Sequence, residues 1–205
     1  MTDRNRPRVF LGITGASGAP YAARILQGLA AVGAEVGVCA SESAGEVIAW
    51  EVYRERAEPG QGQAIVSRFV REHGGDRATL YGERDWFSPY ASGSARCDAY
   101  IICPCSMATV GTIASSGQAN LIHRAAGVAL KEDRRLVVVP RETPLSVIHL
   151  QQLLVLRQAG ALVAPAMPAF YTRPETLDDV VDFVAGKVLD LAGIDHDLLR
   201  RWGAA

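Results

Sequence analysis

The chain has 205 residues, which suits one sizeable hydrophobic core, and we expect a single domain over 1–205 with a flexible polar arm at 1–7. Its 21 basic and 22 acidic side chains leave a formal net charge of −1, which argues against nucleic acid or an anionic membrane as the main partner. No stretch approaches the ~20 apolar residues of a membrane span, so we expect a cytoplasmic protein with no membrane partner.

Apolar runs alternate with amphipathic stretches along the chain. In chain order, the pattern predicts a strand at 8–14, a helix at about 18–32, a strand at 35–41, a helix at 42–54, a strand at 99–104, a helix from about 106, a helix at 121–132, a strand at 134–140, a helix at 145–159, a short strand at 161–166, and helices at 175–192 and 195–202. Residues 55–95 are irregular and rich in glycine and charge, and we expect a helix and a mobile loop there.

This alternation predicts an α/β fold, in which helices cover both faces of a mostly parallel sheet. In such sheets ligands bind beyond the carboxyl ends of the strands. The predicted strands end in polar or glycine-rich segments: "TGASGAP", "SES", "PCSMAT" and "PRETP". The sequence therefore predicts a ligand site along one edge of the sheet.

Two strand ends lead directly into a helix. In "GITGASGAP", the glycines and Ser17 expose backbone N–H groups and a hydroxyl at a helix start, which favours an anion such as phosphate. A tight strand-to-helix turn explains this stretch about equally well. In "CPCSMAT", Ser106 is placed to cap the following helix, and this structural role is favoured over ligand contact when the segment is considered alone.

Charged residues mark two further segments. Arg124 and Lys131 are seven residues apart on a predicted helix and share one face among apolar neighbours, which slightly favours an anion pocket over a solvated face. In "VVVPRETPL", Pro140 and Pro144 restrict the backbone around Arg141 and Glu142 at the end of a buried strand.

The sequence gives little sign of a metal site. The four cysteines form no CxxC pair, there is no HExxH motif, and no cluster of carboxylates suggests metal ligands. We therefore expect no metal and interpret the cysteines as small buried thiols.

Together, these motifs resemble the UbiX family of flavin prenyltransferases. The resemblance covers nearly the whole chain, from "GITGASGAPYAARIL" through "DWFSPYASGS", "CPCSMAT", "RAAGVALKE" and "VPRETPLS" to "PAFYTRPETLDDVVDF" and "RRW". It implies a three-layer flavodoxin-like or Rossmann-like fold and a homo-oligomer, typically a dodecamer built from trimers, with sites at subunit contacts. It also implies transfer of a dimethylallyl group from dimethylallyl phosphate to reduced FMN, which gives prenylated FMN for UbiD-type decarboxylases.

The resemblance also implies roles for individual residues. Those expected to line the FMN are Gly15, Ala16, Ser17, Ser41, Ser106, Met107, Ala108, Thr109 and Arg141. Ser17 and Glu51 match the pair near the flavin N5, and Glu142 matches the acid that protonates the departing phosphate. Residues matching those that grip this phosphate are Arg124, Lys131, Tyr171 and Lys187, with Lys131 also counted among the catalytic group. Trp86 and Trp202 match aromatic positions near the prenyl group.

Four positions depart from the family pattern. Ala108, Ala119 and Gly127 stand where relatives often carry lysine, aspartate and aspartate, and Lys187 stands where arginine is frequent. Two alternatives therefore stay open. One is a flavin-dependent cysteine decarboxylase of the same superfamily, although its "PASANT"-like motif is replaced here by "CPCSMAT". The other is an FMN-binding or carrier protein without turnover.

Overall fold

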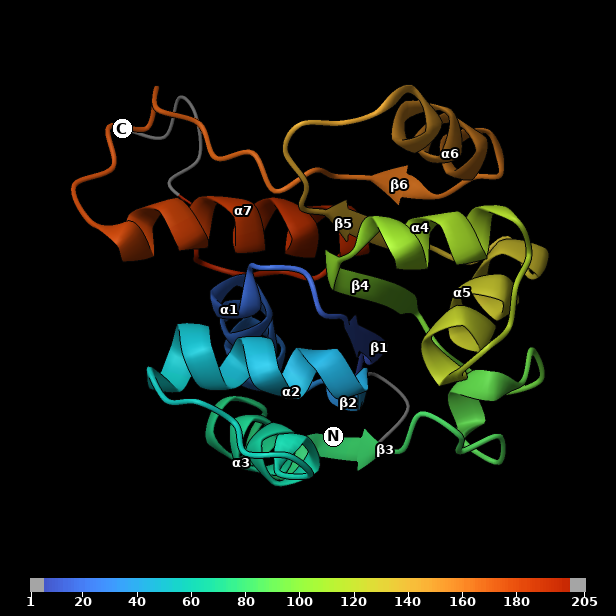
Figure 1. The fold of residues 1–205 in the computed structure, drawn as a ribbon, viewed down its shortest axis with the longest axis horizontal. Helices are drawn as coiled ribbons and strands as arrows, with labels where there is room; N and C mark the ends of the chain where they lie inside the picture. Colours follow the sequence, from blue (N-terminus) through green and yellow to red (C-terminus); the bar gives the residue numbers. More distant parts are fainter. Residues whose placement is uncertain (1–5, 200–205) are drawn as a thin grey trace.

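The computed structural model describes residues 6–199, which are built around a six-stranded, all-parallel sheet (Figure 1). The strands are β1 (Arg8–Ile13), β2 (Glu35–Ala40), β3 (Ala78–Tyr81), β4 (Ala99–Cys105), β5 (Leu136–Pro140) and β6 (Leu162–Val163). Their order is β3-β2-β1-β4-β5-β6. This is the strand order of the doubly wound Rossmann fold, so the Rossmann-like expectation is confirmed.

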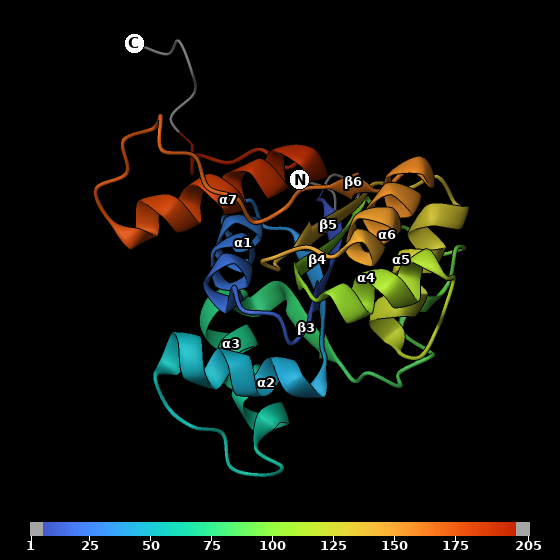
Figure 2. The ribbon, with the colours of Figure 1, turned by 45° about the horizontal axis from the view of Figure 1, so that its top comes forward.

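Helices cover both faces of the sheet and give three layers (Figures 1 and 2). One face carries α1 (Ala19–Ala31), α2 (Glu42–Ile48), α3 (Gly62–His73) and α7 (Leu177–Ala192). The other face carries α4 (Met107–Ala114), α5 (Leu121–Lys131) and α6 (Val147–Gln158). Shorter helical turns are the π-helix η2 (Ala49–Tyr53) and the 3-10 turns η3 (Gly75–Arg77) and η4 (Pro89–Ala91).

Side-chain alternation along the central strands builds two separate cores. In β1, Leu11 points into the core under α1 and α7, whereas Phe10 points into the core under α4 and α5. Gly12 follows on the second face, where a Cβ would lie 2.9 Å from Ile122 Cγ2. Glycine therefore lets α5 pack closely against the sheet.

The structure differs from the predicted elements in four places. The irregular segment 55–95 contains α3 and also an unpredicted strand, β3, at the edge of the sheet. The predicted helix 42–54 is α-helical only to Ile48 and continues as a π-helix. The strand expected at 161–166 is two residues long. The helix predicted at 195–202 is wrong over 195–199, and its remainder lies outside the described residues.

Strand order creates a topological switch point between β1 and β4. These strands are neighbours in the sheet, but β1 leads into α1 on one face and β4 leads into α4 on the other. The two connections therefore part at the carboxyl edge, which is where doubly wound folds bind their ligands.

Candidate active site

A buried threonine joins the two strand ends at the switch point. Thr14, which is 2% exposed, donates its Oγ1 hydrogen to Pro104 O over 2.8 Å, and the same oxygen accepts from Ser106 N over 2.8 Å. Its backbone N–H also donates to Pro104 O, over 3.2 Å. These bonds fix the start of the loop after β1 against the start of α4, and the sequence-based reasoning did not identify Thr14.

The loop after β1 is closely packed against α2. A Cβ on Gly15 would lie 2.2 Å from Ser43 Oγ and 2.7 Å from Ser43 Cβ, so only glycine fits without a shift. Gly18 has a φ of 128°, a conformation that residues with a side chain rarely adopt. Between these glycines lie buried Ala16 and exposed Ser17. The loop therefore presents Ser17 outward on a fixed backbone.

A carboxylate already occupies the N-terminus of α1. Glu51 Oε2 accepts from both Gly18 N and Ala19 N, each over 2.8 Å. The carboxylate satisfies N–H groups that α1 itself leaves unpaired and suits the positive end of the helix dipole. Glu51 comes from the π-helix η2, and its bond to Gly18 N holds it next to the residue that follows Ser17. An anionic ligand at this helix start would have to compete with Glu51.

A second carboxylate serves α2. Ser41 occupies the N-cap position of α2 but its side chain makes no capping hydrogen bond; its Oγ lies 3.2 Å from Ser43 Oγ. Ala44 N donates to the Ser41 backbone carbonyl over 2.9 Å, and Glu83 Oε2 accepts from the first amide of the helix, Glu42 N, over 3.1 Å. By contrast, Ser106 caps α4 with its own side chain, as Thr109 N donates to Ser106 Oγ over 3.2 Å. The predicted cap at Ser106 is therefore confirmed.

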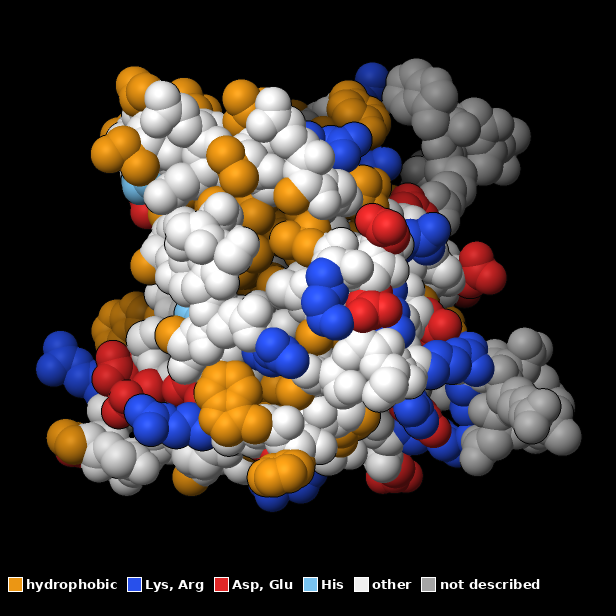
Figure 3. Space-filling view, turned by 90° about the vertical axis from the view of Figure 1, so that its right-hand side faces the viewer, with side chains coloured by type: hydrophobic (Ala, Val, Ile, Leu, Met, Phe, Trp, Pro, Cys, Tyr) orange, Lys and Arg blue, Asp and Glu red, His pale blue; other side chains and the backbone are white. Residues whose placement is uncertain are grey.

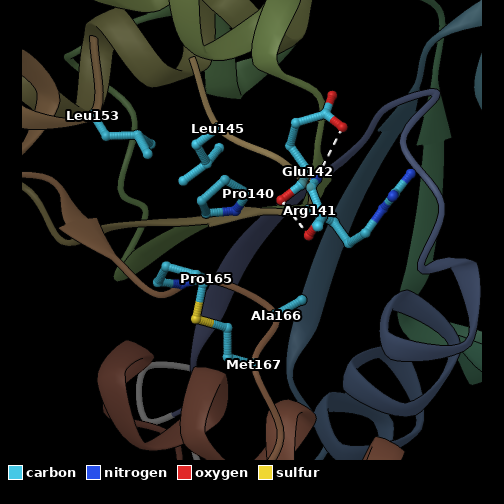
Figure 4. A pocket seen from close by; sticks show the side chains of 9 residues that line it. Pro140, Arg141, Glu142, Leu145, Leu153, Pro165, Ala166 and Met167 are labelled. Atoms are coloured by element: carbon cyan, nitrogen blue, oxygen red, sulfur yellow. Dashed lines mark hydrogen bonds between the residues drawn. The ribbon is translucent and has the colours of Figure 1, made fainter. Parts of the chain in front are cut away.

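Arg141 reaches across the switch point from the end of β5. Its Nε donates to Ser17 O over 3.1 Å, and its backbone N–H donates to Cys105 O over 3.3 Å. Figure 4 shows the guanidinium directed away from the apolar side chains of the adjacent pocket and toward the loop after β1. Glu142 is half-buried, and its Oε1 accepts from Thr143 N over 3.0 Å. The peptide bond between Thr143 and Pro144 is cis.

An open pocket with an empty volume of about 370 Å³ lies beside this arginine (Figure 4). Its walls combine one acid, one base and one threonine with apolar side chains: Pro140, Arg141, Glu142, Thr143, Leu145, Leu153, Pro165, Ala166 and Met167. The pocket therefore places Glu142 at the border between an apolar surface and the polar switch point.

The two predicted cations of α5 lie at different ends of the helix. Arg124 is half-buried and donates from Nε to Ala91 O over 2.9 Å and from NH1 to Gln118 Oε1 over 2.6 Å. Lys131 is exposed, lies about 10 Å further along the helix axis, and pairs with Glu132 over 2.7 Å. These contacts direct Arg124 toward η4 and Lys131 toward the surface. The hydrogen bonds described for the two cations do not reach Ser17 or Arg141.

The remaining predicted substrate residues within 6–199 lie on the surface. Tyr171 is 64% exposed, and its ring meets Phe183 edge-on with centroids 6.0 Å apart. Lys187 is exposed on α7, one helical turn beyond Phe183, and Trp86 is 47% exposed in the loop after β3. Trp202 lies outside the described residues. In this single chain, the described substrate residues thus come from four separate segments: α5, α7, the stretch before α7 and the loop after β3.

The chemistry of the cysteines agrees with the sequence-based interpretation. All four are free and buried, and burial raises the pKa of Cys39 to about 12 and that of Cys103 still higher. Such thiols are poor nucleophiles at neutral pH.

Within residues 6–199, no group of three His, Cys, Asp or Glu side chains could hold a metal ion, and no helix has the length and apolarity needed to cross a membrane.

Comparison with known proteins gives consistent relatives. The family model described as Flavoprotein matches residues 1–189. Flavin prenyltransferase UbiX of Pseudomonas aeruginosa is 45% identical over 199 residues, which cover 96% of this chain and 94% of the relative. The crystal structure of AnUbiX (PadA1) in complex with FMN and dimethylallyl pyrophosphate superposes with a TM-score of 0.83 at 36% identity, covering 98% of this chain and all of the other. A dodecameric FMN-dependent Ubix-like decarboxylase from Escherichia coli O157:H7 gives a TM-score of 0.79 at 37% identity, covering 97% and 100%.

Proposed function

The chain belongs to the UbiX family of flavin prenyltransferases, and we propose that it transfers a dimethylallyl group from dimethylallyl phosphate to reduced FMN. The observation that carries the proposal is the meeting of Ser17, Glu51 and Arg141 at the switch point. We further propose that 1–205 acts as a single domain, in the cytoplasm, and that its prenylated FMN is used by a UbiD-type decarboxylase.

The donor set at the switch point suits FMN. Its residues offer hydroxyls, backbone N–H groups and one guanidinium, which match a phosphate and the polar edge of a flavin ring. The residues that would hold the cofactor are Gly15, Ala16, Ser17, Ser41, Ser106, Met107, Ala108, Thr109 and Arg141. Reduced FMN, when bound, supplies the ring nitrogen that accepts the dimethylallyl group. Buried Thr14 holds the loop after β1 against the start of α4, the two sides of this site.

We assign the proton chemistry to two glutamates. Glu51 lies next to Ser17 and would accept the proton released where the new bond forms. Glu142, at the border of the apolar pocket, would protonate the departing phosphate. The departing phosphate also needs positive charge, which Arg124, Lys131 and Lys187 would supply. The Tyr171 hydroxyl would donate a further hydrogen bond to it. Trp86 and Trp202 would offer π faces to the allylic group.

Dispersion of these residues in one chain supports a site completed at subunit contacts. The α6 helix provides a surface for assembly, because its outer side exposes large apolar residues: Val147, Ile148, Leu150, Leu154 and Val155. Figure 3 shows hydrophobic side chains over the upper part of this face, where α6 lies, and most charged side chains over the lower part. A helix that is apolar on both sides is normally buried. We propose a homo-oligomer, a dodecamer built from trimers.

The assembly proposal is tested with Leu154→Glu, which places a charge in the centre of the apolar α6 face. Light scattering coupled to size exclusion should show smaller species for this variant. The control Gln158→Glu adds the same charge at the exposed end of α6 and should assemble as the wild type does. Full-size assemblies of Leu154→Glu would show that α6 is not a subunit contact.

The enzymatic proposal is tested by anaerobic incubation with reduced FMN and dimethylallyl phosphate. The expected result is a flavin heavier by one dimethylallyl group, measured by mass spectrometry. Unchanged FMN despite tight binding would contradict the proposal and favour an FMN carrier. Decarboxylation of a cysteine-containing substrate by the same preparation would favour the cysteine decarboxylase alternative.

A further inference from the structure

We infer that Tyr53 is a positioning residue for Glu51, because its contacts with α3 hold the π-helical turn that carries this carboxylate. The inference rests on the proposed function insofar as Glu51 accepts the proton released where the new bond forms. Tyr53 is the last residue of η2, two residues after Glu51. The side chains that hold it, Arg68 and Glu72, both come from α3.

The π-helical turn η2 depends on contacts with neighbouring elements. Its sequence, "AWEVY", consists mostly of residues with modest helix propensity. Arg54, which follows the turn, has a φ of 56°, a conformation that costs free energy for a residue with a side chain. The N–H groups of Arg54 and Glu55 both donate to the carbonyl of buried Ala49. Side-chain contacts are therefore needed to keep η2 in this conformation.

Tyr53 makes two such contacts with α3. Its hydroxyl donates to Glu72 Oε2 over 2.8 Å, and the Arg68 guanidinium lies over its ring, 3.7 Å from the centroid. Arg68 Nε also donates to Glu72 Oε1 over 3.0 Å, and Arg68 NH1 lies 3.4 Å from Glu55 Oε1. Each of the three side chains therefore contacts the other two, and Arg68 also contacts a residue just beyond η2.

The protonation states of these groups favour the contacts at neutral pH. Hydrogen bonds from Tyr53 and Arg68 lower the pKa of Glu72, so its carboxylate stays ionised. Burial and the bond to Glu72 raise the pKa of the Tyr53 phenol, which therefore stays a donor. A hydrogen bond to an ionised acceptor is stronger than one between neutral groups. The Arg68 cation is in turn attracted by the face of the Tyr53 ring.

The α3 helix is itself fixed against the rest of the protein. It lies beside α2 in both ribbon views (Figures 1 and 2), and a Cβ on Gly45 of α2 would lie only 2.6 Å from Gly62 Cα at the start of α3. The inner side of α3 is buried in the core: Ile65, Val66, Phe69 and Val70. Tyr53 is therefore held by an element that cannot easily move with it.

Glu51 contacts a different neighbour from the same turn. Its Oε2 accepts from Gly18 N and Ala19 N at the start of α1, whereas Tyr53 reaches α3. Because only Val52 separates Glu51 from Tyr53, a movement of Tyr53 displaces the backbone that carries the carboxylate. The contacts of Tyr53 with α3 therefore keep the Glu51 carboxylate at the loop after β1.

Turnover of the full-length protein tests the inference. Tyr53→Phe keeps the ring and loses the bond to Glu72, and Arg68→Gln removes the guanidinium from the ring. Each should lower kcat for prenyl transfer by about threefold to tenfold and change the KM for dimethylallyl phosphate by less than about twofold. Arg77→Gln is the matched control for Arg68→Gln, because it removes the same charge from the exposed turn η3 and should keep the wild-type kcat.

A comparison in the Glu51→Ala background separates positioning from a general loss of structure. If Tyr53 acts through the carboxylate, Tyr53→Phe should not lower kcat further once the carboxylate is absent. The urea midpoint of the FMN-free protein gives a second comparison that needs no turnover. Tyr53→Phe should lower this midpoint more in the wild-type background than in the Glu51→Ala background, because only the former has a carboxylate at the start of α1 to displace.

Two results would overturn the inference: a wild-type kcat in Tyr53→Phe, or equal effects of Tyr53→Phe in the two backgrounds on kcat or on the urea midpoint. A wild-type protein that binds FMN but yields no prenylated product would instead refute the proposed reaction. The midpoint comparison would then still test whether Tyr53 positions Glu51.

Discussion

Replacing Thr14 with valine should destabilise the switch point while keeping the shape of the side chain. Thr14 is almost fully buried, and its hydroxyl is both donor to Pro104 O and acceptor from Ser106 N. Valine retains the bulk and loses both hydrogen bonds. Pro104 O keeps the bond from the backbone N–H of residue 14, whereas Ser106 N loses its acceptor.

The magnitude follows from these two groups. A hydrogen bond contributes about 0.5–1.5 kcal/mol net, and an unsatisfied buried donor costs about 1–3 kcal/mol. Because Ser106 is only half-buried, water can partly replace its acceptor, and we expect a total loss of about 2–3 kcal/mol in the free energy of unfolding. Thr14→Ser keeps the hydroxyl, removes one methyl group, and should cost only about 1 kcal/mol.

Urea unfolding of the FMN-free protein measures both variants against the wild type. All proteins are compared at one concentration, because the stability of an oligomer depends on the concentration of its protomers. FMN affinity should fall in the same order, with valine lowest. A Thr14→Ser variant that is as unstable as Thr14→Val would refute the reasoning, since the hydroxyl would then not carry the effect.

Two further predictions follow from close packing and from burial. Gly15→Ala should weaken FMN binding by more than tenfold in a fluorescence titration, because the added Cβ would overlap Ser43. The control Gly82→Ala places a Cβ in open space and should bind FMN normally. Equal FMN affinities of the two variants would contradict the prediction. Burial lowers the pKa of both His73 and His123 in the folded protein. As the pH falls below about 6.5, these histidines are protonated in the unfolded chain before they are protonated in the folded one, so the free energy of unfolding should decrease. Urea unfolding at pH 7.5 and 5.5 measures this decrease, and the double variant His73→Gln, His123→Gln should show a smaller one.

Most of the fold could be predicted because its central strands are continuous apolar runs. Strands β1, β2, β4 and β5 are buried on both faces, which leaves an unmistakable run of apolar residues in each. Strand β3 was missed because it is four residues long and only partly buried at the sheet edge, so its sequence resembles that of a loop. The helix expected at 195–202 had the right periodicity, but residues 195 and 196 are irregular and residues 197–199 form bends.

The site could be predicted only where it follows from strand ends. Ser41, Ser106 and Arg141 each come directly after a strand, and Ser17 lies in the loop that follows β1. Parallel strands bring their carboxyl ends to one edge. Glu83 follows a strand that was not predicted, and its partners lie 41 and 37 residues away, a separation that no periodicity encodes.

Thr14 illustrates a second limit. Its importance depends on β1 and β4 being neighbours in the sheet, and the pattern of elements along the chain did not specify strand order. Trp202, predicted to contact the prenyl group, lies outside the described residues and stays a prediction.

The π-helix η2 constrains chain length at one point of the protein. Glu51 lies inside this widened turn, which directly continues α2 and ends at Arg54 in the left-handed conformation. Deleting one residue from 49–53 would let α2 continue as an ordinary helix, and each residue beyond the deletion would be rotated by about 100° around its axis. A deletion at Ala49 or Trp50 would thereby swing the Glu51 carboxylate away from Gly18 without changing a single amino acid at the site. Alignment gaps among homologues should therefore avoid this segment and fall instead in the exposed turn at 56–61.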